Sequence, residues 1–63
     1  MQTIDELQAL AAKFEGNARF HEDFARSTKG KNKIYHIKEA ERAREQVRQY
    51  HQMIARRMEK QDA

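Results

Sequence analysis

The sequence predicts an all-α protein: an antiparallel hairpin of two amphipathic helices that dimerises into a four-helix bundle. The 63 residues contain no proline and only two glycines, so almost nothing interrupts a helix. Apolar residues recur at three- and four-residue steps in two stretches separated by one short polar segment. We therefore expect a single domain spanning residues 1–63, with helices at about 3–27 and 33–59 and a turn at 28–32.

The first helix is expected to begin with a capping box. Thr3 precedes Glu6 by three residues, a spacing at which the threonine oxygen accepts a hydrogen bond from a free backbone N–H and the glutamate reaches back. Asp5 adds negative charge at the positive end of the helix dipole. The apolar stripe that follows consists of Ile4, Leu7, Ala11, Phe14, Ala18 and Ala25.

Gly16 and Asn17 interrupt this stretch and leave two alternatives open. The pair could end one helix and cap another, which would give three helices in all. The apolar stripe, however, keeps one phase from Phe14 to Ala18 and beyond. We favour one continuous helix with a weak point, where the glycine costs about 1 kcal/mol.

The segment from Ser27 to Lys33 is the predicted turn. Gly30 is suited to the left-handed conformation that ends a helix, and Asn32 is suited to cap the next one. The segment is also the most positive part of the chain, because its three lysines have no acidic neighbour. It connects the helices. Its lysines Lys29, Lys31 and Lys33, together with the flanking Arg26 and Lys38, are candidate contacts for phosphate.

The second helix carries its own apolar stripe. The stripe consists of His36, Ala40, Ala43, Val47, Tyr50, Ile54 and Met58. Three Glu–Arg pairs spaced i,i+3 are expected to support its exposed face, namely Glu39–Arg42, Glu41–Arg44 and Glu45–Arg48. Arg44 therefore lies on the solvent side, and replacing it by aspartate is expected to change stability little.

Antiparallel packing about the turn brings residues whose numbers sum to about 60 opposite each other. The predicted facing pairs are Phe20 with Ala40, Phe24 with His36, Phe14 with Val47, Leu10 with Tyr50, and Leu7 with Ile54. The hairpin core predicted from this register consists of Leu7, Phe14, Val47, Tyr50 and Ile54.

The first helix has more apolar surface than one partner helix covers. Leu10, Phe20 and Phe24 lie on one flank of its stripe, where they form a candidate surface for self-association or for a partner protein. A two-fold dimer of hairpins is the favoured arrangement, because isologous dimers are the commonest oligomers. A groove filled by a helix of another protein is the alternative.

The residue types argue against catalysis, a cofactor and a metal centre. Without cysteine there is neither a disulfide nor a thiolate ligand. None of His21, His36 and His51 follows a carboxylate or histidine by three or four residues, the spacing of helical metal sites. His21 and His36 could approach each other across the turn, and we expect them there as half-buried interface residues. We expect a non-enzymatic protein with no cofactor.

Nucleic-acid binding is the alternative function. The pI near 9.5, the basic turn and the arginines of the second helix favour it. Acidic residues among those arginines oppose it, and the aromatic rings are expected mostly on the buried stripe, with Tyr35 exposed. No apolar run is long enough for a membrane span and the amino terminus does not resemble a signal peptide, so we expect a cytoplasmic protein that does not enter membranes.

The capped start from Thr3 to Glu6, the Phe-rich middle from Phe14 to Phe24 and the helix from Ile34 to Met58 resemble small accessory proteins of lambda-like temperate phages. These are the early proteins encoded between exonuclease and excisionase. The resemblance covers the whole chain and rests on length and overall character. It implies an early protein of the host cytoplasm that contacts host factors to redirect host physiology or the choice between lysis and lysogeny. It assigns no catalytic or binding residue.

Overall fold

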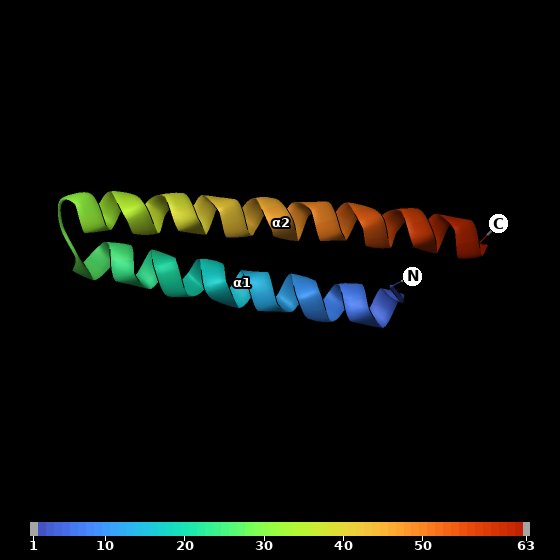
Figure 1. The fold of residues 1–63 in the computed structure, drawn as a ribbon. Helices are drawn as coiled ribbons and strands as arrows, with labels where there is room; N and C mark the ends of the chain where they lie inside the picture. Colours follow the sequence, from blue (N-terminus) through green and yellow to red (C-terminus); the bar gives the residue numbers. More distant parts are fainter. Residues whose placement is uncertain (1, 63) are drawn as a thin grey trace.

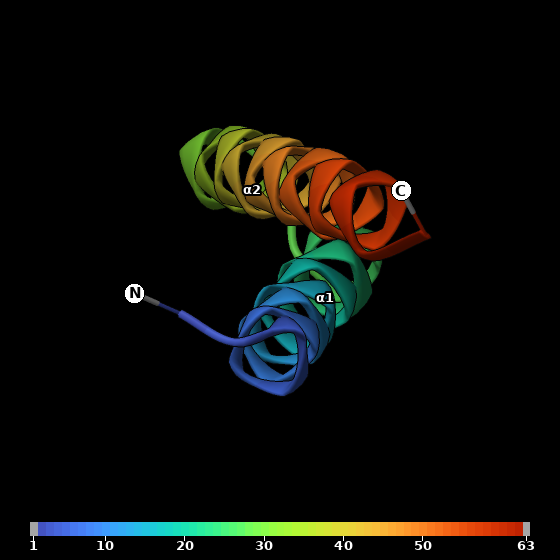
Figure 2. The same ribbon diagram turned by 90° about the vertical axis from the view of Figure 1, so that its right-hand side faces the viewer.

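The computed structural model describes the backbone of residues 2–62 and the side chains of residues 2–60. Within this range the chain forms two helices and no strand: α1, Ile4–Ser27, and α2, Lys31–Asp62. The helices run antiparallel in a single layer, and the start of α1 and the last turn of α2 lie at the end opposite the turn (Figures 1 and 2). The all-helical class predicted from the sequence is confirmed, and the arrangement agrees with the predicted hairpin.

The amino-terminal cap of α1 forms as predicted on its threonine side. The Oγ1 atom of Thr3 accepts a hydrogen bond from the backbone N–H of Glu6 at 3.1 Å. The same hydroxyl donates to Oε1 of Glu6 at 3.3 Å, so the glutamate meets the side chain of Thr3. α1 then continues unbroken through Gly16 and Asn17, which confirms the continuous helix.

The turn is shorter than predicted, because α2 begins at Lys31 and not near residue 33. Gly30 has a φ of +71° and its carbonyl accepts from the N–H of Ile34 at 3.3 Å. Gly30 therefore has the predicted left-handed conformation, but it caps the start of α2 and does not end α1. Asn32, the predicted cap, lies inside the helix. Thr28, in an extended conformation, follows the last residue of α1.

A seam of small side chains holds the helices together. The buried residues are Leu7, Ala11, Ala18, Ala25, Ala40, Ala43, Val47 and Ile54. Five of these eight are alanines, and the larger three lie toward the open end of the hairpin. Among the predicted core residues, Phe14 and Tyr50 are only half-buried. The core is thin, and the rod measures 50 × 17 × 14 Å.

α2 is the longer helix and extends past the first residues of α1 (Figure 1). Its 32 residues exceed the 24 of α1 by a length of about 12 Å at the usual helical rise. Met58, on this part of α2, is 48% exposed. In residues 2–62, neither helix has a stretch with the length and hydropathy needed to cross a bilayer.

Candidate interaction surface at the turn end of the hairpin

Aromatic rings from both helices meet beside the turn. On α1, Phe20 and Phe24 lie one helical turn apart, with ring centroids separated by 4.7 Å. Phe24 stacks across the interface on His36 of α2, with centroids 5.1 Å apart. Tyr35 packs edge-on against His36 at 5.1 Å and lies 6.2 Å from His21. We call these five residues, Phe20, His21, Phe24, Tyr35 and His36, the aromatic cluster.

The outer rings of the aromatic cluster are open to solvent. Phe20, Phe24 and Tyr35 are 54%, 45% and 56% exposed. The prediction that the rings lie mostly on the buried stripe, with Tyr35 alone exposed, is therefore wrong. At this level the interface is filled by small side chains such as Ala25 and Ala40, so the rings lie beside the seam and not within it. The result is an apolar surface next to the turn.

Leu10 lies apart from the aromatic cluster. It is half-buried, and ten residues of helix separate it from Phe20, a distance of about 15 Å along the axis. Between these two levels, Phe14 stacks on Tyr50 with ring centroids 5.7 Å apart. The three residues predicted for the association surface thus occupy two separate levels of α1, with only Phe20 and Phe24 in direct contact.

The Phe14–Tyr50 stack differs from the predicted pairing of Tyr50 with Leu10. Side chains on a helix lean toward its amino terminus. In an antiparallel hairpin, those of α1 therefore lean toward the open end and those of α2 toward the turn. Phe14 and Tyr50 therefore lean toward each other along the rod. Their rings meet although their backbone positions are offset by about one helical turn.

His21 and His36 form a direct contact between the helices within the aromatic cluster. Their Nδ1 atoms are 2.8 Å apart and their ring centroids 5.1 Å apart. Both side chains are half-buried, as expected from the sequence. At this distance one Nδ1 donates a hydrogen bond and the other accepts it, so the two rings adopt different tautomers when both are neutral.

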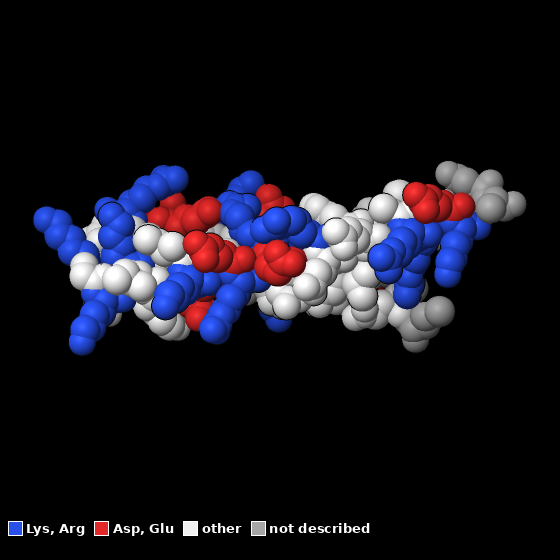
Figure 3. All heavy atoms as spheres, turned by 90° about the horizontal axis from the view of Figure 1, so that it is seen from above, with Lys and Arg blue, Asp and Glu red and all other residues white. Residues whose placement is uncertain are grey.

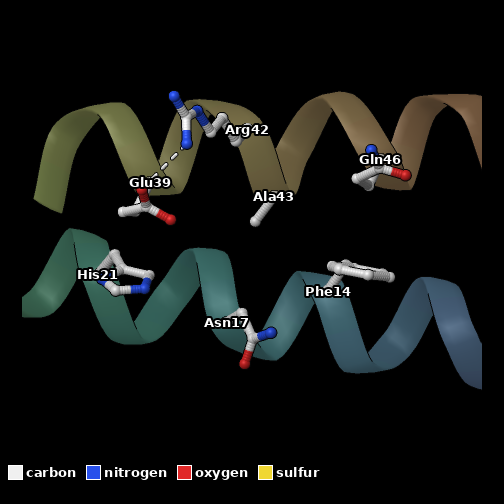
Figure 4. A pocket seen from close by; sticks show the side chains of 7 residues that line it. All are labelled: Phe14, Asn17, His21, Glu39, Arg42, Ala43 and Gln46. Carbon is white, nitrogen blue, oxygen red and sulfur yellow. Dashed lines mark hydrogen bonds and ion pairs between the residues drawn. The ribbon is translucent and has the colours of Figure 1, made fainter.

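A shallow groove of about 140 Å³ opens beside His21 between the two helices (Figure 4). Glu39 of α2 lies across the groove from His21, and its Oε1 accepts a hydrogen bond from Arg42 at 3.5 Å. We call this side of the hairpin, which bears the aromatic cluster and the Phe14–Tyr50 stack, the ring side. The groove is lined by Phe14, Asn17, His21, Glu39, Arg42, Ala43 and Gln46.

On the other side of the seam an ion pair joins the helices. Arg44 donates from Nε and Nη2 to the two carboxylate oxygens of Glu22, at 2.8 and 2.6 Å. Glu22 and His21 are adjacent in sequence and flank the buried Ala18–Ala25 stripe on opposite sides. We call this second side the ion-pair side. Its groove contains Ile37, Ala40 and Glu41 as well.

The Glu22–Arg44 pair corrects the predicted partner of Arg44. Arg44 was expected to pair with Glu41 within α2, as the observed pairs Glu39–Arg42 and Glu45–Arg48 do. The two parallel hydrogen bonds to Glu22 explain the difference, since a guanidinium matches a carboxylate best in this geometry. Replacing Arg44 by aspartate would put two carboxylates together, so a small effect on stability is no longer expected.

The ion pair shifts the titration of both partners. The hydrogen bond from Arg44 lowers the pKa of Glu22, aided by the positive charges of Arg44, Arg26 and Arg19. The same hydrogen bond and the charge of Glu22 raise the pKa of Arg44 above its ordinary value. Both side chains remain partly exposed, at 36% and 44%, so solvent screens the pair.

Positive charge surrounds the turn. Arg26 pairs with Asp23 at 3.7 Å, but both side chains are more than 70% exposed. The lysines of this region make no ion pair among the described residues and are exposed. Figure 3 shows this basic end, with acidic residues interspersed farther along α2. We call Arg26, Lys29, Lys31, Lys33 and Lys38 the basic rim.

Comparison of the chain with protein-family models, with curated proteins and with solved structures found no match. In residues 2–60 there is no group of three or more His, Cys, Asp or Glu side chains arranged to hold a metal ion.

Proposed function

We propose that this chain is a non-enzymatic helical interaction protein that binds another polypeptide through its ring side. The observation that carries the proposal is the exposure of Phe20 and Phe24, which touch each other and continue onto α2 through His36. Burying a large apolar side chain contributes roughly 1.5–3 kcal/mol of free energy, so a partner that covers both rings gains a substantial binding energy.

A second copy of the chain is the partner we propose first. The hairpin has a thin core, with a radius of gyration of 14.7 Å where a compact chain of this length has about 11 Å. Residues 1–26 carry a net charge of −2 and residues 34–63 a net charge of +2. In a two-fold dimer, α1 of each copy therefore packs against an oppositely charged α2, and the four-helix bundle gains the core that one hairpin lacks.

Sedimentation equilibrium at several concentrations tests the dimer. We expect a mass of twice 7.5 kDa, reduced to that of the monomer by Phe20→Ser with Phe24→Ser. The matched control is Ile37→Ser, because Ile37 is 40% exposed on the ion-pair side. A mass of 7.5 kDa at all concentrations, or equal dissociation by the control, would reject this dimer.

A host protein is the partner that the phage resemblance implies. An apolar helical groove or helix would cover the same two rings. If the chain is monomeric, affinity capture from host extract should recover a host protein on the parent chain and on the Ile37→Ser variant. The double variant Phe20→Ser with Phe24→Ser should not recover it. Recovery that is equal with all three chains would reject the ring side as the binding surface.

Nucleic-acid binding is the second candidate, and the basic rim favours it. Its four lysines are exposed and make no ion pair among residues 2–60, and the exposed ring of Tyr35 lies beside them. Phosphate contacts make affinity fall steeply with salt, whereas apolar contacts do not. Titration of duplex DNA at two salt concentrations separates the candidates. Lys29→Gln with Lys31→Gln should weaken DNA binding, and Lys13→Gln on α1 should not.

A further inference from the structure

We propose that His21 and His36 together form a binding site for a divalent transition-metal ion, with Cu²⁺ preferred, that joins α1 to α2. Neutral imidazole nitrogens are good ligands for copper, nickel and zinc. The two Nδ1 atoms already converge from different helices to 2.8 Å. The sequence predicted that His21 and His36 approach each other across the turn but not that they bind a metal, because the usual spacing rule concerns ligands within one helix.

The chemistry of the two ligands favours copper among the divalent metals. With metal–imidazole bonds of about 2.0 Å, two neighbouring ligands of a square-planar ion lie about 2.8 Å apart, and those of a tetrahedral ion about 3.3 Å apart. The observed separation of 2.8 Å is that of the hydrogen bond between the rings, and it shows that both nitrogens are within reach of one ion. Cu²⁺ and Ni²⁺ favour that geometry with nitrogen and oxygen ligands, and Cu²⁺ binds most strongly in the divalent series. Zn²⁺, which prefers the tetrahedron, should bind less tightly.

Metal binding replaces the hydrogen bond between the rings. The ring whose Nδ1 carries the proton shifts it to Nε2 through solvent, which leaves a lone pair on both Nδ1 atoms. Rotation of the rings about their Cβ–Cγ bonds, a soft torsion, then turns both lone pairs toward a common point beside the line that joins them. Water molecules supply the remaining ligands, because the described residues offer no third histidine or carboxylate in the required arrangement.

The surroundings admit such an ion. The groove beside His21 gives access from solvent, and the negative charge of Glu39 on its opposite wall is offset by Arg42, which donates to Glu39 at 3.5 Å. Both histidines are half-buried and their rings are held by neighbours, since His36 stacks on Phe24 and His21 meets Phe20 edge-on at 5.3 Å.

Titration of Cu²⁺, Ni²⁺ and Zn²⁺ chlorides into the metal-free protein tests the site. We expect one Cu²⁺ per chain, with an imidazole-nitrogen signature in its electron paramagnetic resonance spectrum. His21→Gln or His36→Gln should weaken binding at least about tenfold, since even the outer-shell partners of metal ligands contribute that much. His51→Gln is the matched control, because His51 is exposed on α2 outside the cluster, and it should bind Cu²⁺ as the parent chain does.

A thermal melt gives a second readout that reports the link between the helices. Excess Cu²⁺ should raise the melting temperature of the parent chain and of His51→Gln, but not of His21→Gln. If a variant folds poorly, the Gly16→Ala background restores helix stability, since nothing lies within 4 Å of an added methyl group there. Undiminished affinity in His21→Gln, loss of binding in His51→Gln, or one Cu²⁺ per two chains would overturn the proposed site.

Discussion

The two sides of the helix interface hold the same pair of helices by different chemistry. On the ring side, His21 meets His36 and Phe14 stacks on Tyr50. On the ion-pair side, the residue next to His21, Glu22, is bound by Arg44. Stacked rings respond little to salt, whereas a partly exposed ion pair weakens as salt screens it. One alanine-rich seam thus separates an exposed apolar surface from an ion pair between the helices.

The largest expected loss of stability comes from a substitution in the seam, because it disrupts the contacts on both sides of the interface. Val47 is buried in the seam between them, at 8% exposure, so Val47→Asp places a charge without a partner in the interface. We expect a loss of more than about 3 kcal/mol, which would unfold a hairpin of this size. Circular dichroism during a thermal melt measures it. Gln49→Asp adds the same charge at an exposed position of α2 and should leave the melt nearly unchanged.

A middle-sized effect should be confined to the ring side. Phe14→Ala removes the stack on Tyr50, and we expect a loss of about 2 kcal/mol, because the ring is only half-buried and a fully buried one costs roughly 3–5 kcal/mol. Phe20→Ala is the comparison, since that ring is 54% exposed. In the monomeric chain, urea denaturation should rank Phe14→Ala well below Phe20→Ala in stability. The reverse ranking would show that the aromatic cluster holds the hairpin together.

The smallest effect should belong to the ion-pair side and depend on pH. The pKa of Glu22 in the fold lies below its ordinary value because Arg44 binds the ionised form. The pair therefore stabilises the fold above the ordinary pKa of a glutamate, and this contribution disappears as the pH falls through the lowered pKa. Glu22→Gln should lose stability at neutral pH and little in acid. Glu41→Gln, in the same groove, is the control, and melts at both pH values in low and high salt decide the result.

The helices were predictable from local signals, and so were the Phe24–His36 and His21–His36 contacts beside the turn, whereas the contacts made by longer side chains were not. The Thr3 cap, the stripe phase across Gly16 and the glycine between the helices are properties of neighbouring residues, and α1 and the turn follow from them. The Glu22–Arg44 and Phe14–Tyr50 contacts depend on how far long side chains lean along the rod. The start of α2 at Lys31 depended on which of two capping residues, Gly30 or Asn32, the backbone uses.

The order of the contacts along the rod has a consequence for the kinetics of folding. His21 and His36 are separated by 15 residues, Glu22 and Arg44 by 22, and Phe14 and Tyr50 by 36. Closing the longest of these loops first costs about 0.8 kcal/mol more than closing the shortest, but each contact made from the turn outward leaves only a short loop for the next. The contacts of the hairpin should therefore form in order from Gly30 toward the open end. The amide hydrogens at the open end should exchange fastest.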